Sequence, residues 1–127
     1  MGTLETIDTK SAPAAIGPYS QAIRANGFLY TSGQIPLNPE TGALEGESIE
    51  AQAERAIRNL GEILTAAGTD FSKVVKTTCF LAHISDFAAF NAVYEKYFVS
   101  KPARSCFEVA ALPKGALVEI EAVAVVE

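Results

Sequence analysis

Hydrophobic residues recur along the chain with two different periods. Over residues 49–67 they return every three or four positions, and charged residues occupy the remaining positions. That spacing is typical of an amphipathic helix, for which Ser48 is a plausible N-cap and Gly68 a natural end. Aromatic residues in 87–98 make a second stripe with the same period, which predicts another helix that stops before Pro102.

Shorter runs with strand character lie on both sides of the first helix. Residues 19–24 and 28–32 flank Asn26-Gly27, a dipeptide that favours a two-residue hairpin because both of its residues tolerate positive φ. Residues 6–8 are consistent with a short edge strand. Residues 74–82, rich in Val, Thr and Phe, predict a buried strand.

The last quarter of the chain contains two more strand-like runs, separated by residues 112–115 (LPKG). A strand alternates its faces at each residue, so each run has an apolar face and a face interrupted by polar side chains. The polar faces carry Arg104, Cys106 and Glu108 in the first run and Glu119 and Glu121 in the second. Strands that only filled a core would not need an arginine and carboxylates, so this stretch indicates a site.

The predicted order is strand, strand, helix, strand, helix, strand, strand, which is an α+β arrangement. Two helices can cover only one face of a sheet. The other face must then be polar or buried in an oligomer. The pattern alone would also allow the last two strands to pair with each other as a hairpin.

Composition narrows the functional classes. The chain has 127 residues and a net charge of −5, and its lysines and arginines are scattered. We therefore do not expect a nucleic-acid partner, because phosphate binding needs a basic surface. No apolar run reaches the roughly 18 residues of a membrane span. The two cysteines are expected to be reduced thiols of a cytoplasmic protein.

Four ordered blocks resemble one known family, the Rid (reactive intermediate deaminase) family. The blocks are residues 12–22 (APAAIGPYSQA), 30–36 (YTSGQIP), 90–98 (FNAVYEKYF) and 102–124 (PARSCFEVAALPKGALVEIEAVA). The resemblance covers nearly the whole chain, so we expect a single Rid-family domain over residues 1–127. It implies a chorismate-mutase-like mixed sheet with two helices on one face and the last strand between two earlier ones. It also implies a homotrimer with sites in the clefts between subunits.

The resemblance implies a 2-iminobutanoate/2-iminopropanoate deaminase, which hydrolyses reactive enamine and imine intermediates to 2-keto acids and ammonia. Arg104 matches the family's carboxylate-binding arginine, and its fork suits bidentate binding. Glu119 matches the residue that activates water, and Glu121 is interpreted as structural. The positions that match the pocket lining are Tyr19, Ser32, Gly33, Asn91 and Cys106.

Each of these residues also has a plainer interpretation. Arg104 and Glu119 are candidates for structural ion pairs, and Asn91 for a surface amide. We expect Arg104 to face the cleft and not the helix-packed core. Cys106 is interpreted as a pocket wall and not a nucleophile, because the chain offers it no recognisable base, and Cys79 as a core residue. No metal or nucleotide cofactor is expected, since His83 is the only histidine and phosphate-binding loops do not occur.

Two other functions remain open at this stage. One is an endoribonuclease or translation inhibitor, an activity also attributed to the family, against which the acidic charge argues. The other is a non-catalytic small-ligand-binding or chaperone-like protein, which would need Arg104 but not Glu119. The sequence does not give the preferred side chain of the imino acid.

Overall fold

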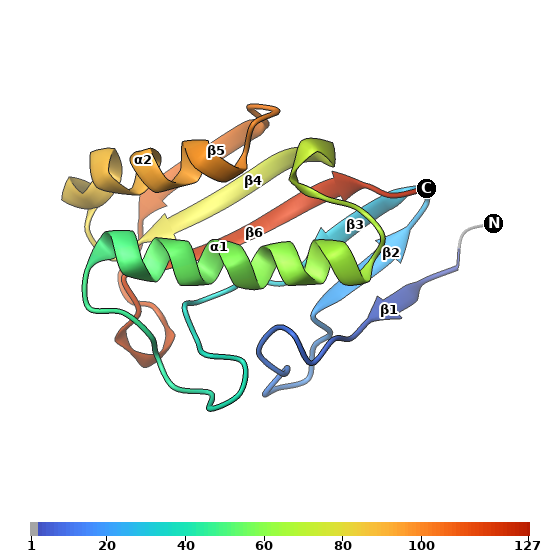
Figure 1. The fold of residues 1–127 in the computed structure, drawn as a ribbon, viewed down its shortest axis with the longest axis horizontal. Helices are drawn as coiled ribbons and strands as arrows, with labels where there is room; N and C mark the ends of the chain where they lie inside the picture. The colour runs from blue at the N-terminus through green and yellow to red at the C-terminus, as the bar shows by residue number, and fades with distance from the viewer. Residues whose placement is uncertain (1–2) are drawn as a thin grey trace.

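The computed structural model describes residues 3–127, and it places two helices against one layer of sheet (Figure 1). The α+β class is therefore confirmed. The strands are β1 (Glu5–Ile7), β2 (Ala22–Ala25), β3 (Phe28–Thr31), β4 (Val74–Leu81), β5 (Ala103–Glu108) and β6 (Val118–Val125), and the helices are α1 (Ile49–Ala66) and α2 (Phe87–Tyr97).

The sheet is mixed, with the strand order β1-β2-β3-β6-β4-β5. β4 and β5 run parallel, and the other neighbouring pairs are antiparallel. The last strand, β6, lies between β3 and β4, as the family resemblance implied. β5 and β6 do not pair, so the hairpin that the hydrophobic pattern allowed does not form.

Local sequence signals set the ends of several elements. Asn26 and Gly27 have φ values of 52° and 84°, which is the backbone conformation that the predicted hairpin between β2 and β3 needs. The hydroxyl of Ser48 accepts a hydrogen bond from the Ala51 amide at 3.1 Å and so caps α1. Gly68, with a φ of 85°, follows the helix as predicted.

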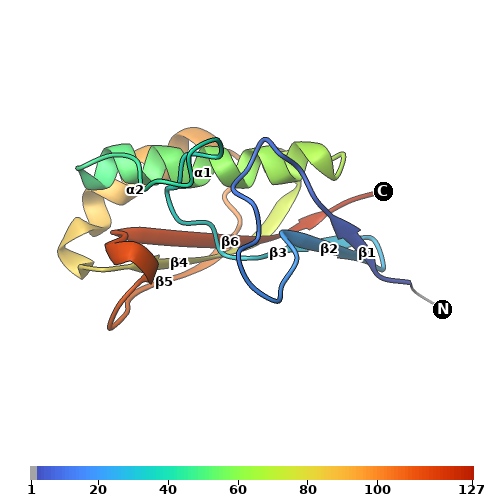
Figure 2. The same ribbon diagram turned by 90° about the horizontal axis from the view of Figure 1, so that it is seen from below.

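Both helices lie on the same side of the sheet (Figure 2), and the buried apolar side chains pack between them and the strands. The apolar stripe of α1 packs there with Leu29, Ile120 and their neighbours, all fully buried. Phe90 and Phe98 at α2 join the same core. Burial of this apolar surface is the main source of stability for the layered arrangement.

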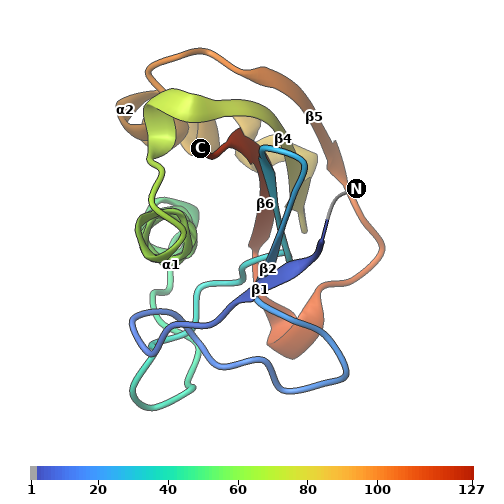
Figure 3. The ribbon, with the colours of Figure 1, turned by 90° about the vertical axis from the view of Figure 1, so that its right-hand side faces the viewer.

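Of residues 3–127, neither α-helix covers the opposite face of the sheet (Figure 3). Aromatic side chains stand exposed on it: Phe28 is 38% exposed, Tyr30 48% and Phe107 44%. The register places Phe80 beside both Phe107 and Glu119, so this bare face also carries the carboxylates of β6. The apolar side of β5 is therefore its exposed side, whereas the apolar side of β6 is buried.

Candidate functional site

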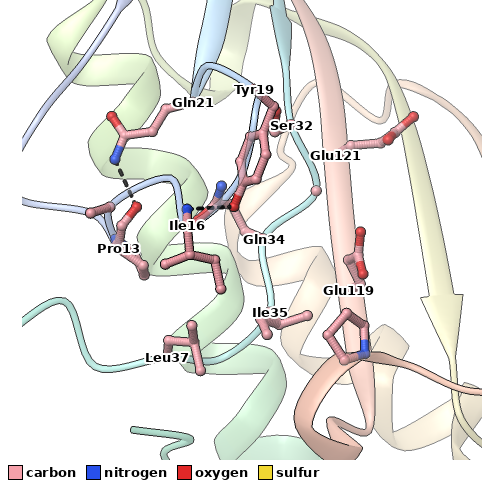
Figure 4. A pocket seen from close by; sticks show the side chains of 13 residues that line it. Pro13, Ile16, Tyr19, Gln21, Ser32, Gln34, Ile35, Leu37, Glu119 and Glu121 are labelled. Atoms are coloured by element: carbon pink, nitrogen blue, oxygen red, sulfur yellow. Dashed lines mark hydrogen bonds between the residues drawn. The ribbon is translucent and has the colours of Figure 1, made fainter. Parts of the chain in front are cut away.

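A cavity of about 520 Å³ lies beside β6 on the bare side of the sheet (Figure 4). Glu119 and Glu121 both line it, together with Tyr19, Ser32 and Gly33 from the amino-terminal third of the chain. Four of the expected site residues thus come together in one chain, and we call Tyr19, Ser32, Gly33 and Glu119 the Glu119 group. The other lining residues are Pro13, Ala14, Ile16, Gln21, Gln34, Ile35, Leu37 and Pro113.

Glu119 packs directly against the backbone of Gly33. A Cβ atom built on Gly33 would lie 1.9 Å from Oε2 of Glu119, so only glycine leaves room for the carboxylate. Burial raises the pKa of Glu119 above its ordinary value of 4.5, and repulsion from Glu121 raises it further. A carboxyl group held in this way is suited to exchange protons closer to neutral pH.

A local departure from regular pairing brings Gly33 to this position. Beyond β3 the chain rejoins β6 only at Gln34, whose backbone exchanges hydrogen bonds of 2.7 and 3.0 Å with Ile120. Between these points the Thr31 hydroxyl accepts the hydrogen bond of the Ala122 amide at 3.0 Å. The backbone around Gly33 is thereby released from the ladder and faces the cavity.

Ser32 and Tyr19 are held by other backbone contacts. The Ser32 hydroxyl, expected to face a ligand, donates a 2.6 Å hydrogen bond to the Ser20 carbonyl, and Ser32 lines the cavity. Tyr19 is half exposed, and its hydroxyl accepts a hydrogen bond from the Ile16 amide at 3.4 Å. The arm that carries Tyr19 is tied down by the buried amide of Gln21, which donates to the Thr9 and Pro13 carbonyls.

Arg104 lies elsewhere, against α2. Its Nη1 donates a 2.7 Å hydrogen bond to Oδ1 of Asn91. Its guanidinium carbon lies 4.8 Å from the ring centroid of Tyr94 and 5.3 Å from that of Phe87, which are cation–π distances. Asn91 is therefore not only a surface amide. It orients the guanidinium of Arg104, whose other donors remain available for an anion.

Cys106 shares the face of Arg104, two residues farther along β5. Hydrogen bonding with the Cys79 thiol and the positive charge of Arg104 together lower the pKa of Cys106 to about 7, against the effect of burial. Cys79 is fully buried, as predicted. We call Asn91, Arg104 and Cys106 the Arg104 group.

The two groups lie on opposite faces of the sheet within one chain. Arg104 pairs in register with Thr77, a buried residue on the helix-covered face, whereas Glu119 pairs with Phe80 on the bare face. The expectation that Arg104 avoids the helix-packed side is therefore wrong. The parallel pairing of β4 and β5 sets the direction of the side chain, and that pairing points it toward α2.

Three residues with a part in these groups were not assigned one from the sequence. The guanidinium of Arg104 lies over the Tyr94 ring. From the sequence, the position of Tyr94 in an aromatic stripe predicted only a core residue. Gln21 fixes the arm, and Glu121, interpreted from the sequence as structural, lines the same cavity as Glu119. For Tyr94 a signal did exist, because it follows Asn91 by three residues and so lies on the same helix face.

Within residues 3–127, no group of three or more His, Cys, Asp or Glu side chains is placed to hold a metal ion. None of the helices in that range is long and apolar enough to cross a membrane. The Glu119 and Arg104 groups together supply one guanidinium, one carboxyl group, one thiol, two hydroxyls, one side-chain amide and the backbone of Gly33.

Comparison with known proteins gives consistent matches over almost the full length. The family model described as endoribonuclease L-PSP matches residues 9–126. A 2-iminobutanoate/2-iminopropanoate deaminase of Mus musculus is 52% identical over 122 residues, which are 95% of this chain and 90% of the mouse protein.

Solved structures agree with the sequence matches. A Rid-family protein of Yersinia pestis superposes with a TM-score of 0.95 at 52% identity, covering 98% of this chain and all of the other. The E. coli protein TdcF with bound serine gives a TM-score of 0.91 at 40% identity, covering 97% and 99% of the two chains.

Proposed function

Because the chain belongs to the endoribonuclease L-PSP family, which includes the reactive intermediate deaminases, we propose that it is an enamine/imine deaminase. Its substrates are 2-iminobutanoate and 2-iminopropanoate, and its products are the corresponding 2-keto acids and ammonia. The observation that carries this proposal is the pair of side-chain groups: a guanidinium with free donors and a carboxyl group with a raised pKa.

Arg104 binds the substrate carboxylate in this proposal. Asn91 accepts a hydrogen bond from one donor, and the guanidinium lies over the Tyr94 ring, so these two contacts orient the remaining N–H groups. Such a fork matches the two oxygens of a carboxylate. The bound serine of the E. coli relative is itself a small molecule with a carboxylate, which supports the same class of ligand.

Glu119 handles the protons. As a carboxylate it takes a proton from a water molecule, whose oxygen then attacks C2 of the protonated imine to form a carbinolamine. The protonated Glu119 gives that proton to the carbinolamine nitrogen, and Glu119, again a carboxylate, takes the hydroxyl proton as the C–N bond breaks, ammonia leaves and the C2 carbonyl forms. General acid–base assistance of this kind contributes about 10²–10⁴ in rate. No covalent intermediate with Cys106 is needed.

The Arg104 and Glu119 groups act together only if two chains meet. We propose a homotrimer in which the bare sheet faces pack on one another and each site takes the Glu119 group of one subunit and the Arg104 group of the next. The exposed aromatic residues of that face, among them Tyr30 and Phe107, support such burial. A ring is the simplest closed assembly for a contact between two different surface patches. Action on free metabolic intermediates is consistent with a cytoplasmic location.

The alternatives are separated by a direct assay. A threonine dehydratase generates 2-iminobutanoate, and keto-acid release is followed with and without the protein. The proposal predicts a faster release that Glu119→Gln abolishes. A protein that only binds 2-keto acids would leave the release rate unchanged and would be indifferent to Glu119→Gln. An endoribonuclease would cleave RNA in a parallel assay, which the net charge of −5 disfavours.

A further inference from the structure

The two cysteines of the chain face each other across neighbouring strands. Cys79 on β4 and Cys106 on β5 are direct register partners in the parallel pair, so their side chains emerge on the same face. Neighbouring strands lie about 4.8 Å apart. A disulfide needs Cα atoms at about 4.4–6.8 Å. Both thiols are free in the structure, and the strand pairing places them within bridging distance.

The two thiols differ in access and in acidity. Cys79 is fully buried, whereas Cys106 is partly exposed at the outermost strand of the sheet. With a pKa of about 7, lowered by Cys79 and Arg104, a substantial fraction of Cys106 is thiolate at neutral pH. Because the thiolate is the form that reacts with oxidants, Cys106 is the thiol that reacts first.

We propose that Cys106 is a peroxide-reactive thiol and that Cys79 resolves its oxidised form as a disulfide within the same chain. In the first step the Cys106 thiolate takes one oxygen atom from a peroxide and becomes a sulfenic acid, while the peroxide is reduced to hydroxide. In the second step the Cys79 sulfur attacks the Cys106 sulfur. Hydroxide leaves with the proton of Cys79 as water, and the S–S bond forms.

Cys79 becomes a better nucleophile once Cys106 is oxidised. In the reduced protein, hydrogen bonding with Cys106, burial and the charge of Cys106 together raise the pKa of Cys79. A sulfenic acid carries no negative charge, so the repulsion from Cys106 ends after the first step. The Thr77 hydroxyl and the Arg104 charge, which lower the pKa of Cys79, remain in place.

The disulfide would protect the neighbouring arginine. Without a resolving thiol, further peroxide converts a sulfenic acid to sulfinic and sulfonic acids, which are permanent anions. Such an anion two residues from Arg104 competes for the guanidinium with a substrate carboxylate. This consequence rests on the proposed function, whereas formation of the disulfide does not.

Intact-mass spectrometry of the full chain after treatment with excess hydrogen peroxide tests the disulfide directly. The wild-type chain is expected to lose about 2 Da, to regain its mass with dithiothreitol, and to run as a single chain on a non-reducing gel. Cys79→Val is expected to gain about 32–48 Da, which dithiothreitol does not reverse. Cys79→Ala is a second variant in case valine disturbs packing, and Cys106→Ala is expected to show neither change.

A wild-type chain that gains oxygen without losing about 2 Da would overturn the proposal, as would disulfides only between chains. The same samples are assayed for keto-acid release, each relative to its own untreated activity. We expect dithiothreitol to restore keto-acid release in the oxidised wild type but not in oxidised Cys79→Val. If no sample releases keto acid even before treatment, the proposed function fails while the mass result still decides the disulfide.

Discussion

Replacing Arg104 tests the role of the guanidinium most sharply. Arg104→Ala removes the entire fork, whereas Arg104→Lys keeps the charge but offers a point donor on a flexible stem. The two variants therefore separate charge from geometry. In the structure one Arg104 donor is engaged by Asn91 at 2.7 Å, and the remaining donors are those expected to hold the substrate carboxylate.

The size of the effect follows from the number of hydrogen bonds lost. A hydrogen bond to a charged group contributes about 1.5–3 kcal/mol, so a bidentate pair contributes roughly 3–6 kcal/mol. Since about 1.4 kcal/mol corresponds to a factor of ten, Arg104→Ala should weaken 2-ketobutanoate binding by roughly 10²–10⁴. Arg104→Lys should recover little and remain at least about tenfold weaker than wild type.

Stability should change much less than binding. Arg104→Ala loses one hydrogen bond to Asn91 and the stacking on Tyr94, together about 1–2 kcal/mol at a partly exposed position. The melting temperature should fall by roughly 3–10 °C for a chain of this size. Arg58→Ala removes the same charge from an exposed position on α1 and serves as the matched control.

Titration calorimetry with 2-ketobutanoate and the coupled hydrolysis assay measure the two effects. Folded Arg104→Ala protein that binds the keto acid as tightly as Arg58→Ala, or hydrolyses the imine at the wild-type rate, would refute the carboxylate-binding role.

Three further variants test other site residues. Glu119→Gln should lower turnover by about 10²–10⁴ while keto-acid affinity is retained, and equal turnover would shift the role to Glu121. The pKa of Glu119 is raised above 4.5, its value in the unfolded chain. Ionisation of Glu119 therefore lowers the free energy of unfolding at neutral pH, and this loss is absent below pH 4.5, where the group is protonated in both states. Glu119→Gln should therefore raise the melting temperature at pH 7, a gain that disappears near pH 4. Gly33→Ala should displace the Glu119 carboxylate, because the new Cβ falls 1.9 Å from Oε2, and turnover should drop at least about tenfold; an active variant would mean that the carboxylate position is unimportant. Asn91→Ala should raise KM more than it lowers kcat, and an unchanged KM would remove its positioning role.

Sequence patterns predicted the parts of the fold that depend on local physics. The Asn26-Gly27 turn, the Ser48 cap and the end of α1 at Gly68 each follow from the backbone preferences of a few adjacent residues. The strand order does not, because the insertion of β6 between β3 and β4 depends on contacts far apart in sequence. The family resemblance supplied that order, whereas the hydrophobic pattern alone left a β5–β6 hairpin open.

In the site, too, local patterns predicted some features and long-range strand pairing determined the others. Alternation in the strands separated Arg104 and Glu119 from the apolar positions, but it did not say which face of the sheet each occupies. That depends on the register of β4 with both β5 and β6, which sends Arg104 toward α2 and Glu119 toward the bare face. The pairing of Cys79 with Cys106 has the same origin, since 26 intervening residues hide it from any local pattern.

Mixed trimers test the central claim, a site shared between neighbouring subunits. Glu119→Gln and Arg104→Ala chains with different affinity tags are coexpressed, and trimers that contain both are isolated by two successive purifications. In any such ring one interface joins an intact Glu119 group to an intact Arg104 group, so about one third of the wild-type activity should return.

Mixed trimers of Glu119→Gln with Gly33→Ala are the matched control, because both changes fall in the Glu119 group and no interface is restored. Activity near one third of wild type in the first mixture and none above the parents in the second is the predicted result. If the first mixture is no more active than its parents, the two groups do not combine across subunits, and the proposed site is wrong.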